Sequence, residues 1–344
     1  MDGSFPPLVV IAGPTGVGKT DVAVRLACRL PVEIVSADSR QVYRGMDIGT
    51  AKPTFAQREA VPHHLIDVVN PDERYHVARF SIEARRAVAA ILERGKLPLV
   101  VGGTGLYIRA LLRGLLPAPP ANAEVRRELT ELLRRDGLPA LHARLRAVDA
   151  EASGRIHEHD AVRILRALEI HRLTGAPVGT PSHWRQSRPE WSLLLVGLTR
   201  PRSSLYAALG ARVDAMVARG LREETRQLLA AGYDGTLAAM QGIGYRHFVK
   251  VLRGASSEAE AIRAMKRDTR LYAKRQWTWF AREPEIRWVD VEAAGGIQGT
   301  AERVEKWIIQ DGLSSEGGCA PLPKLPPQGC AGKAGARTAA ETFD

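Results

Sequence analysis

The sequence predicts an α/β fold in which helices cover both faces of a parallel sheet and an all-helical insertion interrupts the chain. In the first hundred residues, short apolar runs alternate with helical patterns, as in strand–helix–strand units. These runs are rich in β-branched residues and do not alternate with polar ones, which is typical of strands buried on both faces. From about residue 117 to 189, by contrast, there is no strand candidate.

Five runs are the expected strands: residues 8–12, 32–36, 65–69, 97–101 and 193–198. Helical patterns lie between the first four, including residues 19–30 and 78–94, as expected of crossover helices. A further helical region is expected from about residue 203 to 282.

Composition divides the chain into four parts. Residues 1–118 are expected to form the first part of the core, and residues 119–190, which begin and end in Pro-rich sequence, the helical insertion. Residues 191–311 would complete the core and add basic C-terminal helices. Residues 312–344 are rich in Gly, Pro, Ser and Ala, so we expect a disordered tail.

The charge balance suggests a polyanionic partner. The chain has 344 residues, and 49 Lys and Arg against 38 Asp and Glu leave a net charge of +11. That favours nucleic acid, a nucleotide or an acidic membrane surface, although many basic proteins bind no such partner. No apolar run approaches the roughly 20 residues that span a bilayer, and no basic leader precedes the first strand. Three cysteines without metal-ligand spacing predict reduced thiols in a cytoplasmic protein.

A phosphate-binding loop is the most specific motif. Between the first strand and the first helix, eight residues fit G-x-x-x-x-G-K-[ST], namely Gly13, Pro14, Thr15, Gly16, Val17, Gly18, Lys19 and Thr20. The glycines allow backbone N–H groups to surround phosphate oxygens, and Lys19 would neutralise their charge. The Thr20 hydroxyl is the candidate ligand of Mg²⁺. This P-loop predicts a P-loop NTPase-like core and a bound diphosphate or triphosphate, and leaves the reaction open.

Two other strands end in polar or glycine-rich sequence. Ligands of open α/β sheets lie at the carboxyl ends of the strands. Asp38, after the second strand, could be a Mg²⁺ partner, a general base or a helix N-cap. Gly102, Gly103 and Thr104 follow the strand 97–101, where adjacent glycines allow either a ligand or a tight turn.

These segments together resemble a known enzyme family. GPTGVGKT, SADSRQVYRGMDIGTAKP, HHLIDVVNPDERY and VGGTGLYIRALLRG are followed by RILRALEIHRLTGAP, MQGIGYRH and TRLYAKRQWTWFARE. In this order, over about residues 8–290, they are similar to the bacterial tRNA dimethylallyltransferases (tRNA isopentenyltransferases). The resemblance implies transfer of a dimethylallyl group from dimethylallyl diphosphate to N6 of the adenosine 3′ of the anticodon (tRNA position 37). It also implies release of diphosphate, Mg²⁺ as cofactor and the anticodon stem-loop as partner.

The resemblance assigns roles to individual positions. Residues 13–20 and Arg212 would hold the diphosphate, and the catalytic residues would be Asp38, as general base, with Lys19 and Thr104. The implied tRNA contacts are Asp38, Ser39, Arg40, Gln41, Thr104, Arg126, Val162, Arg163, Ile164, Leu165, Arg166, Gln241, Gly242, Ile243, Gly244, Tyr245 and Arg246.

A basic helix is predicted near the end of the core. One face would present Ile262, Met265, Thr269, Tyr272, Gln276 and Trp279, and roughly opposite would lie Arg263, Lys266, Arg267, Arg270 and Lys274. Residues 263–282 hold seven basic side chains and one acid. A solvated basic face is the commoner meaning of such a run. With the family resemblance we expect contact with an RNA backbone instead, through Arg267 and Arg270.

Two other functions fit the P-loop alone. One is a P-loop kinase of a small metabolite or nucleoside, for which Asp67 in LIDVV is the nearest candidate for a strand-end metal ligand. The other is an RNA-binding switch NTPase. Neither explains all the matched segments: the kinase leaves the insertion and QGIGYR without a role, and the switch leaves VGGTGLY. A monomer is expected, because no coiled-coil heptads or exposed apolar stripe are evident.

Overall fold

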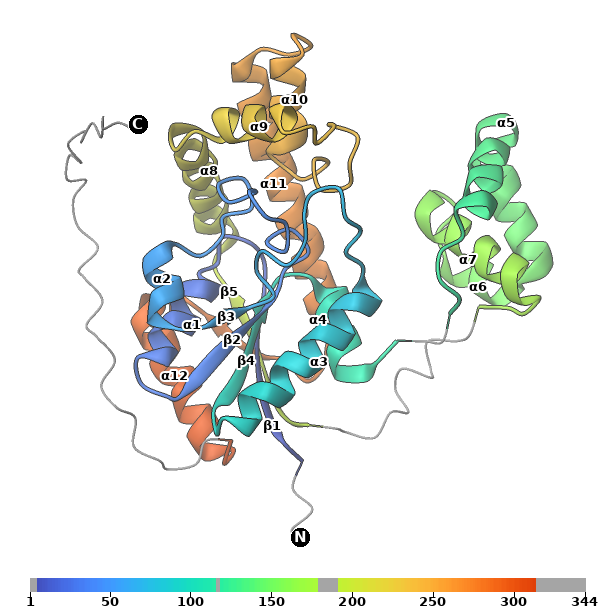
Figure 1. Ribbon diagram of the computed structural model, residues 1–344. Coiled ribbons are helices and arrows are strands. Elements are labelled where there is room, and N and C mark those ends of the chain that lie inside the picture. Colours follow the sequence, from blue (N-terminus) through green and yellow to red (C-terminus); the bar gives the residue numbers. More distant parts are fainter. Residues whose placement is uncertain (1–4, 116–117, 179–190, 314–344) are drawn as a thin grey trace, which may run out of the picture.

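A six-stranded parallel sheet forms the centre of the protein (Figure 1). The computed structural model describes residues 5–115, 118–178 and 191–313. The strands lie in the order β3-β2-β4-β1-β5-β6. Their bounds are β1 Pro7–Ala12, β2 Val32–Ala37, β3 His63–His64, β4 Leu97–Gly102, β5 Ser192–Thr199 and β6 Arg287–Asp290.

The strand register aligns the carboxyl ends of the four central strands. Ala12 of β1 pairs with Gly102 of β4 and with Gly197 of β5, and Ala37 of β2 also pairs with Gly102. The loops that follow these strands therefore leave the sheet along one edge, where ligands of such sheets bind.

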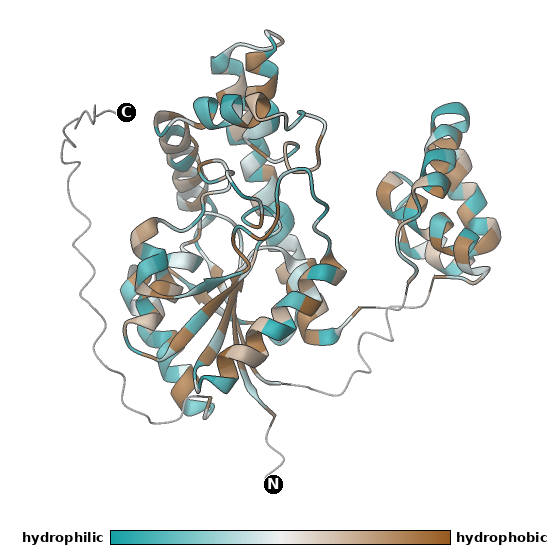
Figure 2. Cartoon of the chain, viewed as in Figure 1, coloured by the Kyte–Doolittle hydropathy of each residue, from teal (hydrophilic) through white to brown (hydrophobic). Residues whose placement is uncertain are grey.

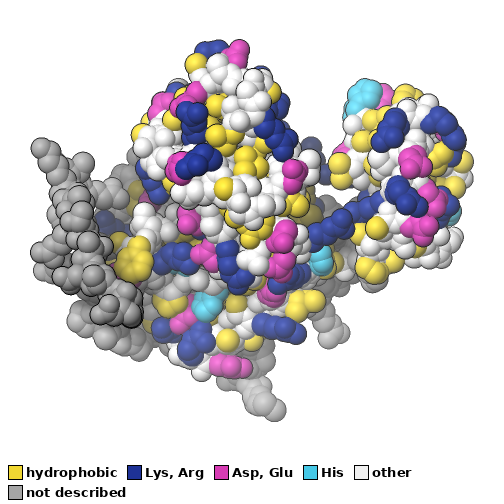
Figure 3. All heavy atoms as spheres, turned by 45° about the horizontal axis from the view of Figure 1, so that its top comes forward, with side chains coloured by type: hydrophobic (Ala, Val, Ile, Leu, Met, Phe, Trp, Pro, Cys, Tyr) yellow, Lys and Arg dark blue, Asp and Glu magenta, His cyan; other side chains and the backbone are white. Residues whose placement is uncertain are grey.

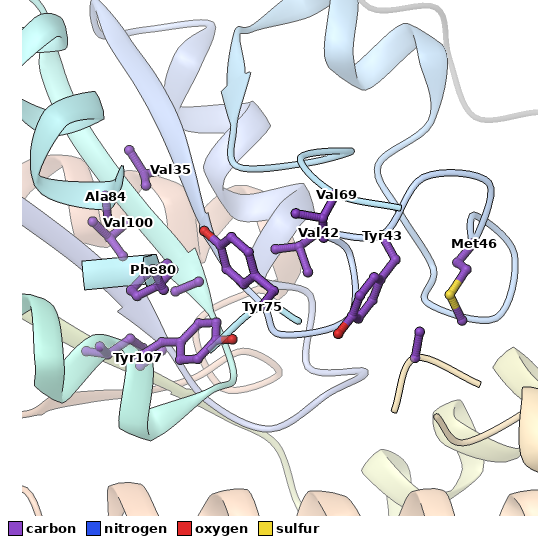
Figure 4. Close-up of a cluster of buried hydrophobic side chains, with 14 of the residues drawn as sticks. Val35, Val42, Tyr43, Met46, Val69, Tyr75, Phe80, Ala84, Val100 and Tyr107 are labelled. Carbon is purple, nitrogen blue, oxygen red and sulfur yellow. The ribbon is translucent and has the colours of Figure 1, made fainter. Parts of the chain in front are cut away.

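Helices cover both faces of the sheet. On one face lie α1 (Lys19–Ala27) and α12 (Gly296–Gln310), which pack on each other, and on the other lie α3 (Val77–Glu93) and α4 (Gly105–Arg113). The strands are correspondingly the most apolar elements, and the helices have mixed faces (Figure 2). On the α3 side, Phe80 stacks on Tyr107 with ring centroids 4.3 Å apart, and Tyr75 meets Tyr107 edge-on (Figure 4).

Above the strand ends, helices α8 to α11 form the upper part of the core (Figure 1). They are α8 (Arg202–Ala218), α9 (Leu221–Ala230), α10 (Tyr245–Leu252) and α11 (Glu258–Phe280). The helical region expected over residues 203–282 is confirmed. So is the two-sided pattern of α11, because all six residues of its predicted inner face are buried or half-buried, while Arg263, Arg267, Arg270 and Lys274 are exposed.

The insertion consists of α5 (Ala123–Val148), α6 (Ala150–Arg155) and α7 (Ala161–Thr174). These helices pack around their own apolar cluster, which includes Leu141, Leu145 and Ile164, and they stand apart from the sheet in Figure 1. Gly137, with φ of 81°, interrupts α5 two residues before Pro139. Over residues 118–178 the structure has no strand, as predicted.

Two predictions about strands were wrong. Residues 65–69 do not form a strand: Leu65 and Asp67 have φ of 62° and 57°, which extended backbone does not allow. The short strand β3 lies just before them, and only a bridge between Tyr43 and Val69 follows. The sixth strand, β6, was not expected.

Some expectations lie outside the described residues. These include the tail after residue 313, with Cys319 and Cys330, and the end of the insertion after residue 178. Within the described part of the chain, no helix is both long and apolar enough to cross a membrane. The loop between β2 and β3 carries the short helix α2 (Phe55–Ala60), which begins at a Thr54 capping box.

Candidate active site

The P-loop has the geometry that its sequence predicts. It leaves the end of β1 and leads directly into α1, whose N-cap is Gly18 with φ of 101°. In this left-handed conformation a side chain would be strained, and a Cβ at Gly18 would also meet Ile297 at 2.5 Å. The loop thus opens onto the first turn of α1, where backbone N–H groups and the helix dipole favour an anion.

Lys19 and Arg212, both half-buried, bring positive charge to this loop. The Nζ of Lys19 donates hydrogen bonds to the carbonyl oxygens of Gly13 (3.0 Å) and Pro14 (2.8 Å). Burial lowers the pKa of Lys19 to about 7, with Asp38 opposing this shift and Arg212 adding to it. Burial also lowers the pKa of Arg212, which Asp38 and Asp21 partly restore. Two half-buried cations, one of which lowers the pKa of the other, would be stabilised by a bound anion.

Asp38 is held by the turn that follows β2. Its Oδ1 accepts hydrogen bonds from the backbone N–H groups of Arg40 (2.8 Å) and Gln41 (3.3 Å). Among the described residues Oδ2 has no hydrogen-bond partner. The turn therefore fixes the carboxylate and leaves one oxygen for another proton donor.

Thr104 and Gln276 connect the strand-end loops. Thr104 Oγ1 accepts a hydrogen bond from the backbone N–H of Ser39 (3.2 Å). Gln276, buried on α11, accepts from the N–H of Thr15 (2.8 Å) through Oε1 and donates to the carbonyl of Gly103 (2.9 Å) through Nε2. A Cβ at Gly103 would lie 2.2 Å from that Nε2. The glycine at this position thus admits a protein side chain from α11.

A cavity of about 340 Å³ lies over the P-loop and is called here the lower cavity. Its lining includes four basic side chains and several with hydroxyl, carboxylate or amide oxygens. They are Lys19, Lys52, Arg200 and Arg212, with Thr20, Asp21, Asp38, Tyr272 and Gln276. Lys52 is itself paired with Asp47 (2.6 Å) and Asp67 (2.5 Å). Of the lining cations, Lys19, Arg200 and Arg212 have no ion pair among the described residues. The cavity is suited to a polyphosphate.

A second cavity, of about 240 Å³, adjoins the first and is called the upper cavity. It is more apolar, with Met46, Val213, Met216, Ile243 and Met265, and it has polar groups from Ser39, Arg40, Gln241, Arg246 and Arg275. Both cavities are lined by Thr15, Asp38, Arg212 and Tyr272. Burial raises the pKa of Tyr272 to about 12, and the nearby Asp38 adds to the shift, so its hydroxyl keeps its proton.

Glu224, on α9, shapes the wall of the upper cavity. Its carboxylate accepts hydrogen bonds from the backbone N–H groups of Asp47 (2.9 Å), Ile48 (2.8 Å) and Gly49 (3.1 Å). It also accepts one from the hydroxyl of the buried Tyr245 (2.6 Å). This single side chain joins the loop after β2 to the start of α10.

Comparison with known proteins assigns this arrangement to a family. Residues 41–283 match the family described as IPP transferase, and residues 6–67 match the one described as isopentenyl transferase. The chain belongs to the IPP transferase family.

Relatives within the IPP transferase family match nearly the whole described chain. A tRNA dimethylallyltransferase of Syntrophobacter fumaroxidans is 52% identical over 85% of both chains, and one of Desulforudis audaxviator is 46% identical over 89% of this chain and 99% of its own. A tRNA isopentenylpyrophosphate transferase structure from Bacillus halodurans has a TM-score of 0.65 at 40% identity, covering 89% of this chain and 98% of its own. The structure of a eukaryotic dimethylallyltransferase acting on tRNA has a TM-score of 0.70 at 29% identity, covering 88% and 76%. The family resemblance in the sequence is confirmed.

Several positions that the family resemblance assigns to tRNA meet at the upper cavity. Ser39 and Arg40 come from the loop after β2, and Gln241, Gly242, Ile243, Tyr245 and Arg246 come from the segment before and at the start of α10. Gln41 instead lines the lower cavity and donates to the carbonyl of Ala51 (3.2 Å). Gly244, with φ of 99°, lines neither cavity and is the N-cap of α10.

Thr104, the N-cap of α4, lines neither cavity. The remaining assigned positions lie in the insertion, which also lines neither cavity. Arg126 and Arg166 both pair with the buried Glu169, at 3.0 and 2.7 Å. Val162 is 78% exposed, Arg163 is exposed, and Leu165 is half-buried. Ile164 is completely buried in the insertion core. The tRNA contact implied for the stretch Val162–Arg166 stays a prediction, and within that stretch Val162 and Arg163 are the exposed side chains.

Arg200, Tyr272 and Gln276 also line the site, and no motif pointed to them. Tyr272 and Gln276 belonged to the predicted inner face of a helix, where apolar packing was the simpler interpretation. Arg200 follows the strand β5, so the rule that ligands bind at strand ends could have found it.

Proposed function

We propose that this IPP transferase uses dimethylallyl diphosphate to prenylate N6 of the adenosine at tRNA position 37, releasing diphosphate. Membership of the family supports dimethylallyl transfer to tRNA. The observation that carries the finer proposal is the position of Asp38 in the wall shared by the cationic lower cavity and the upper cavity, which has an apolar side. A carboxylate there lies between a leaving group and a nucleophile.

The lower cavity would hold the leaving group. Ionising an allylic C–O bond places positive charge on the prenyl unit and negative charge on the diphosphate. The P-loop N–H groups, Lys19 and Arg212 are already oriented there, so stabilising that developing charge needs little reorganisation. Such preorganised electrostatics is usually the largest catalytic contribution.

The residues present fit Mg²⁺. This ion prefers oxygen ligands and commonly keeps waters and substrate oxygens alongside one or two protein groups. The Thr20 hydroxyl and the carboxylates of Asp21 and Asp38 line the lower cavity. No cluster of three His, Cys, Asp or Glu within residues 5–115, 118–178 and 191–313 offers an all-protein cage. Mg²⁺, held by Thr20 and diphosphate, would add charge neutralisation to the leaving group.

The upper cavity would hold the reacting groups. Adenine N6 is a weak nucleophile because its lone pair is delocalised into the ring, so a base within hydrogen-bond reach must orient it and remove a proton. The free Oδ2 of Asp38 is suited to this role. Met46, Val213 and Met216 give the cavity an apolar side that excludes water from the allylic cation. The adenosine must leave its stack to enter, at a cost of a few kcal/mol.

No specific observation favours a kinase. Asp67, the candidate metal ligand of that hypothesis, forms ion pairs with Lys52 (2.5 Å) and Arg58 (2.8 Å) and lines neither cavity.

The test is a comparison of donors. Purified protein is incubated with an unmodified tRNA, Mg²⁺ and either labelled dimethylallyl diphosphate or labelled ATP. We expect label in tRNA from the prenyl donor alone, and none when the adenosine at position 37 is replaced by guanosine, which has no N6 amine. Label from ATP alone, or from neither donor, contradicts the proposal.

A further inference from the structure

Arg200 occupies a position that neither the motifs nor the family resemblance assigns. It directly follows Thr199, the last residue of β5, which pairs with β1 in the sheet. Since the P-loop leaves the end of β1, Arg200 emerges beside it. Its side chain lines the lower cavity together with Lys19, Thr20 and Arg212. One of its terminal nitrogens lies 3.8 Å from where a Cβ of Gly18 would be.

The Arg200 side chain has an unsatisfied donor. Its Nε is buried and has no hydrogen-bond partner in the described part of the chain. A buried N–H without a partner is destabilising, so it is rare outside sites that await a ligand or water. Burial raises the pKa of Asp21, and the charge of Arg200 acts on that carboxyl to lower it. The carboxylate of Asp21 accepts a hydrogen bond from Gln57 (3.0 Å). No ion pair between Arg200 and Asp21 is formed.

We propose that Arg200 contacts the diphosphate directly, as a third cation beside Lys19 and Arg212. The inference rests on the proposed function, because it assumes that the lower cavity holds a diphosphate. An arginine fork matches phosphate oxygens and keeps its charge at any physiological pH. Arg200 lines the same cavity as Lys19 and Arg212, so its guanidinium would add to the positive charge that faces a bound diphosphate.

The direct test is the affinity for inorganic diphosphate, measured calorimetrically in the presence of Mg²⁺. Arg200→Ala removes both the charge and the Nε donor, and we expect the dissociation constant to rise about 10- to 100-fold. Arg200→Lys keeps the charge but loses the planar guanidinium, so its dissociation constant should lie between those of the wild type and Arg200→Ala. Arg202→Ala is the matched control, because Arg202 is two residues away, exposed and outside both cavities.

Steady-state kinetics give an independent readout. In Arg200→Ala the KM for dimethylallyl diphosphate should rise, while the KM for tRNA stays within about twofold. Diphosphate affinity within about twofold of the wild type, or equal loss in Arg202→Ala, overturns the inference. If Arg200→Ala does not fold, Arg200→Lys decides by the same criterion.

The two proposals fail separately. Loss of diphosphate affinity in Arg200→Ala, with a wild type that does not prenylate tRNA, supports the inference and overturns the proposed function. Normal prenylation by Arg200→Ala with unchanged constants overturns the inference and leaves the function in place.

Discussion

At the scale of single residues, Asp38 shows how one side chain serves structure and chemistry. The sequence left a helix cap, a metal partner and a general base open. In the structure its Oδ1 satisfies the turn through the N–H groups of Arg40 and Gln41, and Oδ2 remains for a ligand. The turn and the proposed base are therefore compatible functions of the same carboxylate.

Asp38→Asn separates the role of this side chain in the turn from its proposed role as the general base. The amide oxygen can still accept from the two turn N–H groups, so the fold should be kept, but the amide cannot remove a proton. We expect kcat to fall by about 10²- to 10⁴-fold, with diphosphate affinity within a few-fold of the wild type. Single-turnover prenylation and calorimetry measure the two quantities. Near-normal turnover would show that another group is the base.

Lys19 predicts a proton linkage. With a pKa of about 7, Lys19 is mostly neutral in the free protein at pH 8. Bound diphosphate favours the charged form, so binding at pH 8 should draw about one proton onto Lys19. In Lys19→Arg the cation is permanent and this uptake disappears. Calorimetry in buffers of different ionisation enthalpy measures the difference. Equal proton uptake by the two proteins contradicts the assignment.

At the scale of elements, α11 is tied to the sheet edge by Gln276. The helix carries exposed cations on its outer side and, through one buried amide, holds the P-loop at Thr15 and the β4 loop at Gly103. The glycines after β4 therefore serve a helix contact: a Cβ at Gly105 would lie 2.1 Å from Trp279. A ligand and a tight turn were the sequence interpretations, and an approaching helix was not among them.

Gln276→Leu tests the two hydrogen bonds by which Gln276 connects α11 to Thr15 and Gly103. The variant leaves the Thr15 N–H and the Gly103 carbonyl without partners, which should lower the free energy of unfolding by about 1–3 kcal/mol. Because the Thr15 N–H belongs to the P-loop, the KM for dimethylallyl diphosphate should rise more than kcat falls. Thr278→Ala, at an exposed position of α11, is the control. A stability loss with unchanged KM would make Gln276 purely structural.

At the scale of the whole molecule, much of the positive charge lies from Arg263 in α11 to Arg282, just after its end. Residues 263–282 account for a surplus of six among a net charge of +11. Locally this charge is partly balanced, since Lys266 pairs with Asp214 (2.7 Å) and Arg267 with Asp268 (3.0 Å). In Figure 3 basic side chains are interspersed with acidic ones over the upper face. Recognition of RNA there should combine backbone charge with shape and base contacts.

Replacing Arg267 and Arg270 by Gln should therefore raise the KM for tRNA and reduce its dependence on salt, because fewer counterions are released. The control is the pair Arg303→Gln and Lys306→Gln, which removes two exposed charges from α12 on the opposite side of the sheet from α3 and α4. Titration of KM from about 50 to 200 mM salt measures the slope. A change confined to the KM for the prenyl donor would assign this charge to the diphosphate site.

Patterns local in the chain determined much of this protein. The P-loop, the buried strands β1, β2, β4 and β5 and the two-sided helix α11 depend on neighbours a few residues apart, so spacing and periodicity were sufficient. β6 was missed because its four residues, RWVD, contain no apolar run. The strand expected at residues 65–69 failed for another reason. A five-residue apolar run is compatible with several conformations, and ion pairs of Asp67 with Lys52 and Arg58 selected a turn.

Only the tertiary structure decided how the site is assembled. Asp38 lines a cavity that Gln241 and Arg246, about 200 residues later, also line, and Gln276 reaches back to Thr15. Contacts at such separation arise from helix packing and strand order, which leave no periodic trace in the sequence. The same holds for Arg200, which lies beside the P-loop only because β5 pairs with β1. The sequence therefore predicted a phosphate site at the P-loop, and packing determined which distant side chains surround that loop.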